Sequence, residues 1–208
     1  MSKDYFNAAA AGWDTPERIE RAQKIAVVIR RELRLGPDEV VADYGSGTGL
    51  VAAALAPWVG RVVALDNAPN MLARLAEKCR AGCIPNIETR VFDIETETFE
   101  APFCDVFLSS LVLHHLPSPE RFAWAAWQAL RPGGAVAVID LDSEGGDFHT
   151  GHDEVHHHGF EREALAGIFS DAGFSDLSCE TALTIRKRGR AGVERDFSLF
   201  MLKAFKVG

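Results

Sequence analysis

The sequence predicts a doubly wound α/β fold, in which helices cover both faces of a largely parallel sheet. Apolar runs of strand length alternate with helical patterns over most of the chain, and the run at residues 135–141 is almost continuously apolar, as in strands buried on both faces. The chain has 208 residues, of which 47% are hydrophobic. This is enough for one well-buried core and too little for two, so we expect a single domain.

The elements follow one another regularly along the first two thirds of the chain. Residues 16–35 place apolar side chains at alternating steps of three and four, which is typical of an amphipathic helix. Short apolar runs then predict strands, and segments rich in helix-forming residues predict the helices between them. The predicted strands are residues 40–42, 61–65, 87–92, 106–111 and 135–141, and the later helices are residues 50–56, a helix beginning at Pro69, and residues 119–130, followed by a turn at 131–134.

The last third of the sequence has a different character. Residues 144–159 are polar and rich in histidine, which predicts a loop, and a helix that carries Leu165 and Phe169 on one side follows. Two segments rich in strand-forming residues, 177–185 and 197–205, close the chain around a basic turn. They predict a terminal antiparallel hairpin.

Charge and composition exclude several classes of protein. A formal net charge of −8 argues against a nucleic acid or an anionic lipid surface as partner. No apolar run reaches the ~18 residues of a spanning helix, and residues 1–12 lack the apolar stretch of a signal peptide, so we expect a cytoplasmic protein. The sequence predicts no particular oligomeric state. The cysteines, which lack paired spacing and are expected to be free thiols, are Cys79, Cys83, Cys104 and Cys179.

The segment VADYGSGTG, residues 41–49, predicts a loop that binds a nucleotide-type cofactor. A strand there ends in alternating glycines, which allow a sharp turn and the close approach of a ligand. The dinucleotide fingerprint would need glycine at position 50, which is Leu50, so the spacing argues against NAD. A phosphate loop for ATP would need a lysine, and none occurs between Lys24 and Lys78.

Asp43 with its three following glycines, and Asp66 at the end of the next predicted strand, resemble the class I S-adenosylmethionine-dependent methyltransferases. Further segments agree in order: LRPGG at 130–134 resembles the turn before the family's fifth strand. SSLVLHHL at 109–116 resembles the small-molecule branch that includes the ubiquinone and menaquinone methyltransferase-like enzymes, methyltransferase types 11 and 12. The resemblance implies a Rossmann-like sheet of seven strands with an antiparallel last strand, and S-adenosylmethionine as cofactor with S-adenosylhomocysteine as product.

The resemblance also implies how the single domain is used. Residues 1–35 are expected to form an N-terminal lid and helix, residues 36–142 the cofactor-binding core, and residues 143–208 a substrate-side loop, helix and hairpin. Asp66 is expected to bind both ribose hydroxyls, Asp93 and Ile94 the adenine edge, and Trp13 to shield the sulfonium, although Trp13 and Met71 are also compatible with simple core packing. The expected cofactor-binding residues are Asp43, Gly45, Gly47, Gly49, Asp66, Asn67, Met71, Asp93, Ile94, Ser109 and Trp13.

Histidines are the candidate catalytic residues. Methyl transfer is an in-line displacement that requires positioning, and a hydroxyl or ammonium acceptor also needs a general base with a pKa near neutrality. His114 and His157 are the predicted bases, with pocket shaping and a solvated loop as the respective alternatives. No metal is expected, although His152 and His156 with Asp153 would share one face if their loop were helical.

Absent motifs narrow the acceptor. The Asn/Asp-Pro-Pro-aromatic segment of enzymes that methylate amino groups of DNA bases or glutamine is replaced by residues 109–112, and the Pro-Cys of cytosine-C5 enzymes does not occur. Asp140 and Asp142 are not followed by the asparagine of the Mg-dependent catechol type. The sequence therefore favours a small-molecule acceptor and no nucleic acid. The alternatives are a cofactor-binding module without turnover, and a protein or RNA methyltransferase that needs a partner subunit.

Overall fold

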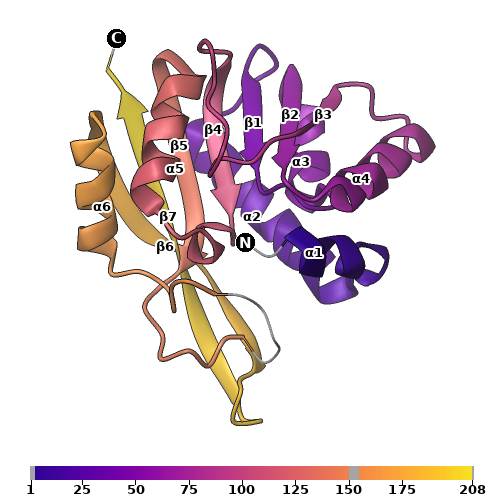
Figure 1. Ribbon diagram of the computed structural model, residues 1–208, viewed down its shortest axis with the longest axis vertical. Helices are drawn as coiled ribbons and strands as arrows, with labels where there is room; N and C mark the ends of the chain where they lie inside the picture. The colour runs from indigo at the N-terminus through magenta and orange to yellow at the C-terminus, as the bar shows by residue number, and fades with distance from the viewer. Residues whose placement is uncertain (1–2, 150–154, 208) are drawn as a thin grey trace.

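The computed structural model describes residues 3–149 and 155–207 and confirms the doubly wound α/β fold (Figure 1). The helices are α1 (Lys3–Ala9), α2 (Pro16–Leu33), α3 (Leu50–Leu55), α4 (Pro69–Ala81), α5 (Pro119–Ala129) and α6 (Arg162–Asp171). The strands are β1 (Val40–Tyr44), β2 (Arg61–Asp66), β3 (Ile87–Val91), β4 (Cys104–Ser110), β5 (Leu130–Leu141), β6 (Phe174–Arg188) and β7 (Glu194–Lys206). Short 3-10 helices are η1 (Ala10–Gly12), η2 (Ala56–Trp58) and η3 (Leu113–His115).

The seven strands form one sheet in the order β3-β2-β1-β4-β5-β7-β6. Strands β3, β2, β1, β4 and β5 are parallel to one another, whereas β7 is antiparallel to both β5 and β6. The expected antiparallel last strand is therefore confirmed. The predicted turn at 131–134 lies within β5, where its pairing with β4 shifts register between Cys104 and Val106.

Helices cover both faces of the sheet because alternate strand residues point to opposite sides. Val41 of β1 packs into the cluster that contains Ile29 of α2, together with residues of α3. Tyr44 of the same strand packs into the other cluster, which contains Phe122 of α5 and Phe169 of α6. Both faces of the central strands are thus buried, as their nearly continuous apolar sequence predicts.

Local sequence signals set the ends of the helices. The Thr15 hydroxyl accepts a hydrogen bond from the Arg18 backbone N–H (3.4 Å), and Pro16 occupies the first turn of α2. The helix ends at Leu33, and the backbone of the next residue, Arg34, is left-handed. Pro69 begins α4, as predicted, because a first-turn proline has no intrahelical N–H bond to lose.

The N-terminal segment lies over the carboxyl-terminal edge of the sheet, beside α4 (Figure 1). Asn70 donates its backbone N–H to the Asn7 side-chain oxygen (2.9 Å), which attaches α1 to the start of α4. The Asp14 carboxylate bonds to the Thr48 hydroxyl in the glycine loop and pairs with Lys78 of α4 (2.8 Å). The sequence patterns do not predict α1, and these contacts explain why it folds here.

The β6–β7 hairpin extends beyond the body of the sheet, beside the loop that follows β5 (Figure 1). Arg195 pairs with Asp147 of that loop (2.6 Å), and Lys187 donates to the Phe148 carbonyl (2.6 Å). Basic residues of the hairpin thus hold the segment that leads to His149. The basic turn predicted from the sequence thus includes a residue, Lys187, with this structural role.

Two further expectations concern spanning helices and free cysteines. No helix within residues 3–149 and 155–207 has both the length and the apolar character needed to span a bilayer. All four cysteines are free, as predicted.

Candidate functional site

A pocket opens at the carboxyl-terminal edge of the sheet, beneath the N-terminal segment. In a doubly wound sheet, this edge is where ligands bind, at the point where strand order reverses between β1 and β4. The wall combines charged, aromatic and apolar side chains from four segments of the chain. The lining residues are Phe6, Trp13, Arg18, Arg21, Ala22, Ile25, Asp43, Gly45, Ser46, Gly47, Thr48, Leu50, Val51, Asp66, Met71, Ser110, Leu111, Val112 and His115.

The glycine loop forms the floor of this pocket, and backbone hydrogen bonds hold it in place. The backbone N–H groups of Gly45 and Ser46 donate to the Leu65 carbonyl (2.8 and 3.0 Å), which ties the loop to β2. Gly47 has a φ of +55°, and a Cβ built on it would meet only the Trp13 Nε1 atom, at 3.9 Å. The backbone at Gly47 is therefore open to the pocket, so a ligand can approach it closely.

Two buried aspartates face the pocket from neighbouring strands. Asp43 is 2% exposed and Asp66 is 4% exposed. Burial, reinforced by the charge of Asp66, raises the pKa of Asp43 to about 8. Within the described residues, Asp43 Oδ2 has no hydrogen-bond partner. A buried aspartate with an unpartnered oxygen favours a cationic or hydrogen-bond-donating ligand.

The end of β2 fixes the position of Asp66. Its Oδ1 accepts a hydrogen bond from the Ala68 N–H and its Oδ2 accepts one from the Gly47 N–H, both at 2.8 Å. Burial raises the pKa of Asp66, while these two backbone bonds oppose the rise. Each carboxylate oxygen can accept a further bond, so Asp66 can bind two vicinal hydroxyls without moving.

Aromatic side chains cover the pocket from the N-terminal segment. Trp13 and Phe6 have ring centroids 5.5 Å apart, and both pack against Met71 and Ala68 of the α4 start. Arg18 lies over the Trp13 ring, 3.9 Å from its centroid. One face of Trp13 is therefore occupied by a guanidinium, and a sulfonium would have to approach another part of the ring.

Two arginines of α2 reach the pocket, and sequence reasoning did not find them. Arg18 and Arg21 both line the wall. Burial, with a smaller contribution from Arg18, lowers the pKa of Arg21 to about 10. A pair of cations at this place suits a carboxylate on the ligand. Their spacing of three residues on a predicted helix is the only sequence signal, and it is common on solvated helix faces.

Five other predicted cofactor residues do not line this pocket. Asp93, Ile94, Asn67, Ser109 and Gly49 are not among the described residues of the wall. The Asp93 carboxylate accepts a bond from the Glu95 N–H (3.0 Å). Ser109 is buried at the end of β4, one residue before Ser110, which does line the wall. Their roles in cofactor binding stay predictions.

The side chains of the two predicted catalytic histidines have different surroundings. His114 of η3 is 1% exposed, and its Nδ1 lies 2.5 Å from Asp140 Oδ1. An ionised carboxylate can only accept, so this contact fits a neutral imidazole that has its proton on Nδ1 and its lone pair on Nε2. The His157 ring lies 5.1 Å from the ring of Phe160, and His157 is not among the described residues of the pocket wall. The backbone N–H groups of His156 and His157 donate to the His114 carbonyl (3.0 and 3.1 Å).

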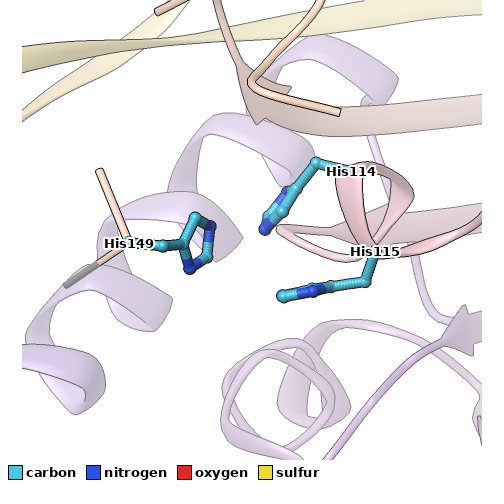
Figure 2. A group of neighbouring side chains, drawn as sticks. All are labelled: His114, His115 and His149. Atoms are coloured by element: carbon cyan, nitrogen blue, oxygen red, sulfur yellow. The ribbon is translucent and has the colours of Figure 1, made fainter. Parts of the chain in front are cut away.

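Three histidine rings meet beside the pocket (Figure 2). His114 and His115 come from η3, and His149 comes from the loop after β5. Ring centroids lie 4.2 Å apart for His114 and His115 and 4.9 Å apart for His114 and His149. Sequence reasoning selected His114 but not this group. The alternative metal ligands His152 and Asp153 lie outside the described residues.

The pocket fits S-adenosylmethionine by its own chemistry. The unpartnered Asp43 oxygen suits a cationic group, fixed Asp66 suits ribose hydroxyls, and the arginines suit a carboxylate. The open backbone at Gly47 leaves room for the ligand between these groups. Fold and pocket together have the features expected of a class I S-adenosylmethionine-dependent methyltransferase domain.

Comparison with known proteins agrees with a methyltransferase fold and pocket. Residues 42–138 match the family model described as a methyltransferase domain. "Uncharacterized methyltransferase C1347.09" of Schizosaccharomyces pombe is 26% identical over 151 residues, 65% of this chain and 53% of that protein. The trans-aconitate 2-methyltransferase of Deinococcus radiodurans is 36% identical over 104 residues, 49% of this chain and 38% of that protein. A SAM-dependent methyltransferase structure from Aquifex aeolicus is 20% identical, with a TM-score of 0.71 and coverage of 97% and 98% of the two chains.

These comparisons confirm the resemblance to class I methyltransferases that the sequence motifs predict. The likeness to the Aquifex aeolicus structure supports the fold alone. The chain spans about half or less of the length of the first curated relatives it matches.

Gly47→Ala tests the close approach at the glycine loop. We expect a loss of stability of about 1–2 kcal/mol from the left-handed backbone, and a much larger loss of cofactor affinity, because the new methyl group occupies ligand space. Gly133→Ala is the matched control, since Gly133 has a φ of +81° and open surroundings far from the pocket. Thermal melts and calorimetric titration measure the two effects. Equal cofactor affinity in the two variants would contradict the placement of the cofactor against the Gly47 backbone.

Proposed function

We propose that this protein transfers the methyl group of S-adenosylmethionine to a small-molecule acceptor. The observation that carries the proposal is the pocket in which buried Asp43 and Asp66 face the open backbone of Gly47, at the sheet edge where this fold binds ligands. In this proposal, residues 1–35 act as lid and helix, residues 36–142 bind the cofactor, and residues 143–208 supply the acceptor side.

The proposed chemistry is a direct displacement. When bound, S-adenosylmethionine supplies a methyl group to the acceptor's lone pair, the C–S electron pair stays on sulfur, and the acceptor's proton leaves. The chain holds the two reactants in line and excludes water, and no nucleophile on the protein is needed. Trp13 and Phe6 exclude water on the side of the N-terminal segment, and Asp66 fixes the ribose of the cofactor.

His114 is the residue we propose to act at the acceptor. Asp140 holds its ring through Nδ1, which leaves the Nε2 lone pair on the side of His115, a residue of the pocket wall. An imidazole held through Nδ1 in this way can accept a proton or bind a metal ion through Nε2. His157 stays a predicted second base.

Three observations support a small acceptor. Phe6 and Trp13 of the N-terminal segment line the pocket, as expected of a site that covers a small ligand. The net charge of −8 opposes binding of nucleic acid. The Deinococcus radiodurans relative is named for a small carboxylate, trans-aconitate, and Arg18 and Arg21 suit an acceptor of that charge as well as they suit the cofactor. A cytoplasmic location stays a prediction.

The experiment that tests this function is incubation with S-adenosylmethionine and a pool of small metabolites, followed by measurement of S-adenosylhomocysteine. We expect product that depends on the pool. A module without turnover would bind cofactor and form no product with any pool. An RNA or protein methyltransferase would form product only with a macromolecular fraction, and RNA retention would weaken with salt.

Cofactor binding is expected to release protons near neutral pH. The raised pKa of Asp43, about 8, means that most of this carboxyl is protonated at pH 7 before a ligand binds. A cationic ligand favours the carboxylate, so affinity should rise by up to about tenfold per pH unit below pH 8 and then level off. Titration of S-adenosylhomocysteine in buffers of different ionisation enthalpy measures the protons. Asp43→Asn should remove the release, and an unchanged release would assign it to another group.

A further inference from the structure

We propose that His114, His115 and His149 form a binding site for a divalent transition metal ion, with zinc as the best chemical match, at the acceptor end of the pocket. One ring nitrogen of each histidine lies within 4.8 Å of the others. Figure 2 shows the three rings directed toward a common space, although His149 is far from the other two in sequence. Spacing along the chain therefore predicts no metal site here.

His114 has the tautomer and orientation of a metal ligand. With Nδ1 donating to Asp140, a neutral His114 ring has its lone pair on Nε2, and Nε2 is buried with no hydrogen-bond partner among the described residues. An orphaned buried nitrogen is costly unless a ligand binds it. Metal-bound histidines commonly donate their other ring nitrogen to a carboxylate, which orients the ring and increases its basicity.

Asp140 adds an electrostatic argument. It is fully buried and accepts hydrogen bonds from His114 Nδ1 (2.5 Å), the His114 N–H (3.3 Å) and the Leu141 N–H (2.7 Å). No lysine or arginine is among these donors within the described residues. A buried carboxylate requires a positive charge nearby or strong compensation by hydrogen bonds. A metal ion on His114 Nε2 would supply that charge through the ring.

The geometry needs a modest closure to bind an ion. Zinc–nitrogen bonds of about 2.0–2.1 Å in tetrahedral geometry place ligand nitrogens about 3.4 Å apart, so the rings would have to approach one another by ~1 Å. His115 and His149 each offer two ring nitrogens, so each can ligate through one and keep another interaction through the second. Three histidines with an open fourth position are the ligand set of catalytic zinc sites.

The position of this site gives it a role in acceptor binding, and this part rests on the proposed function. His115 lines the cofactor pocket, so an ion held by this residue would lie beside that space. The acceptor would then carry a metal-binding donor atom, such as a hydroxyl, amine or thiol. Coordination would use the His114 lone pair that otherwise accepts a proton, and the acceptor's proton would leave to solvent.

The test is zinc binding by the full chain without a histidine tag. After removal of metal with a chelator, we expect zinc chloride to bind at one ion per chain by calorimetry and elemental analysis, and cobalt(II) chloride to give the visible bands of a tetrahedral site. His149→Ala should abolish both signals. His156→Ala is the matched control, because His156 is an exposed histidine outside the cluster, and it should bind as the wild type does.

Asp140→Asn adds a second variant that keeps all three ligands. We expect its zinc affinity to fall by about 10–100-fold, because the carboxylate no longer supports His114. Absence of stoichiometric zinc binding, or equal binding by wild type and His149→Ala, would overturn the metal site. Titration of S-adenosylhomocysteine into the same samples separates the two proposals. A protein that binds S-adenosylhomocysteine but not zinc would keep the proposed function and contradict the metal site. A protein that binds zinc but not S-adenosylhomocysteine would keep the metal site and contradict the proposed function.

Discussion

Replacing Asp66 by alanine is expected to weaken binding of S-adenosylmethionine by about 1.5–3 kcal/mol, or roughly 10–150-fold, the range for hydrogen bonds to a charged group. The carboxylate is buried and held by the Gly47 and Ala68 N–H groups, so its bonds to ribose hydroxyls form without loss of side-chain freedom. Calorimetric titration of the cofactor measures the change.

The loss of Asp66 also leaves the Gly47 and Ala68 N–H groups without their acceptor, so part of the effect could come from a displaced loop. Circular dichroism and thermal melts show whether the fold is kept. Glu88→Ala is the matched control, because it removes the same charge from an exposed position on neighbouring β3. Unchanged affinity in a folded Asp66→Ala protein would refute the ribose assignment.

Replacing His114 by alanine is expected to lower turnover by about 10²-fold or more, the usual contribution of a positioned acid–base group, while cofactor affinity stays close to that of the wild type. His114 is not part of the described wall of the cofactor pocket, and its Nε2 lies on the side of His115. The rate of S-adenosylhomocysteine formation with an acceptor found in the metabolite screen measures the effect.

His157→Ala provides the comparison. Sequence reasoning predicts a fall in turnover for both histidines, and the structure places only His114 in the histidine cluster beside the pocket. We therefore expect the larger loss in His114→Ala. Full activity in both variants would mean that neither is the base, and loss of cofactor affinity in His114→Ala would assign it a structural role in the pocket.

The sequence predicts most of the fold because the local signals are strong. Pro16 and Pro69 begin their helices, and nearly continuous apolar runs mark the buried strands. The glycine loop and Asp66 are also predictable, since a strand end followed by alternating glycines restricts what the backbone can do. These features depend on residues close together in the sequence.

Features that depend on distant contacts were not predictable. Helix α1 is held by Asn70, and the turn predicted at 131–134 is drawn into β5 by its pairing with β4. Arg21 looks like any polar residue of an amphipathic helix until the fold places it in one pocket wall with Phe6 and Trp13. His149 joins His114 only through the path of the loop that Asp147 fixes against Arg195.

The most direct test of this account is calorimetric titration of the purified chain with S-adenosylmethionine and S-adenosylhomocysteine, with NADH as the control. We predict micromolar binding of S-adenosylmethionine and S-adenosylhomocysteine and no binding of NADH. The spacing of Gly45, Gly47 and Gly49, together with Asp66, fits the first two compounds and not a dinucleotide. Absence of binding by a folded sample, or preference for NADH, would contradict the assignment of the glycine loop and of Asp66.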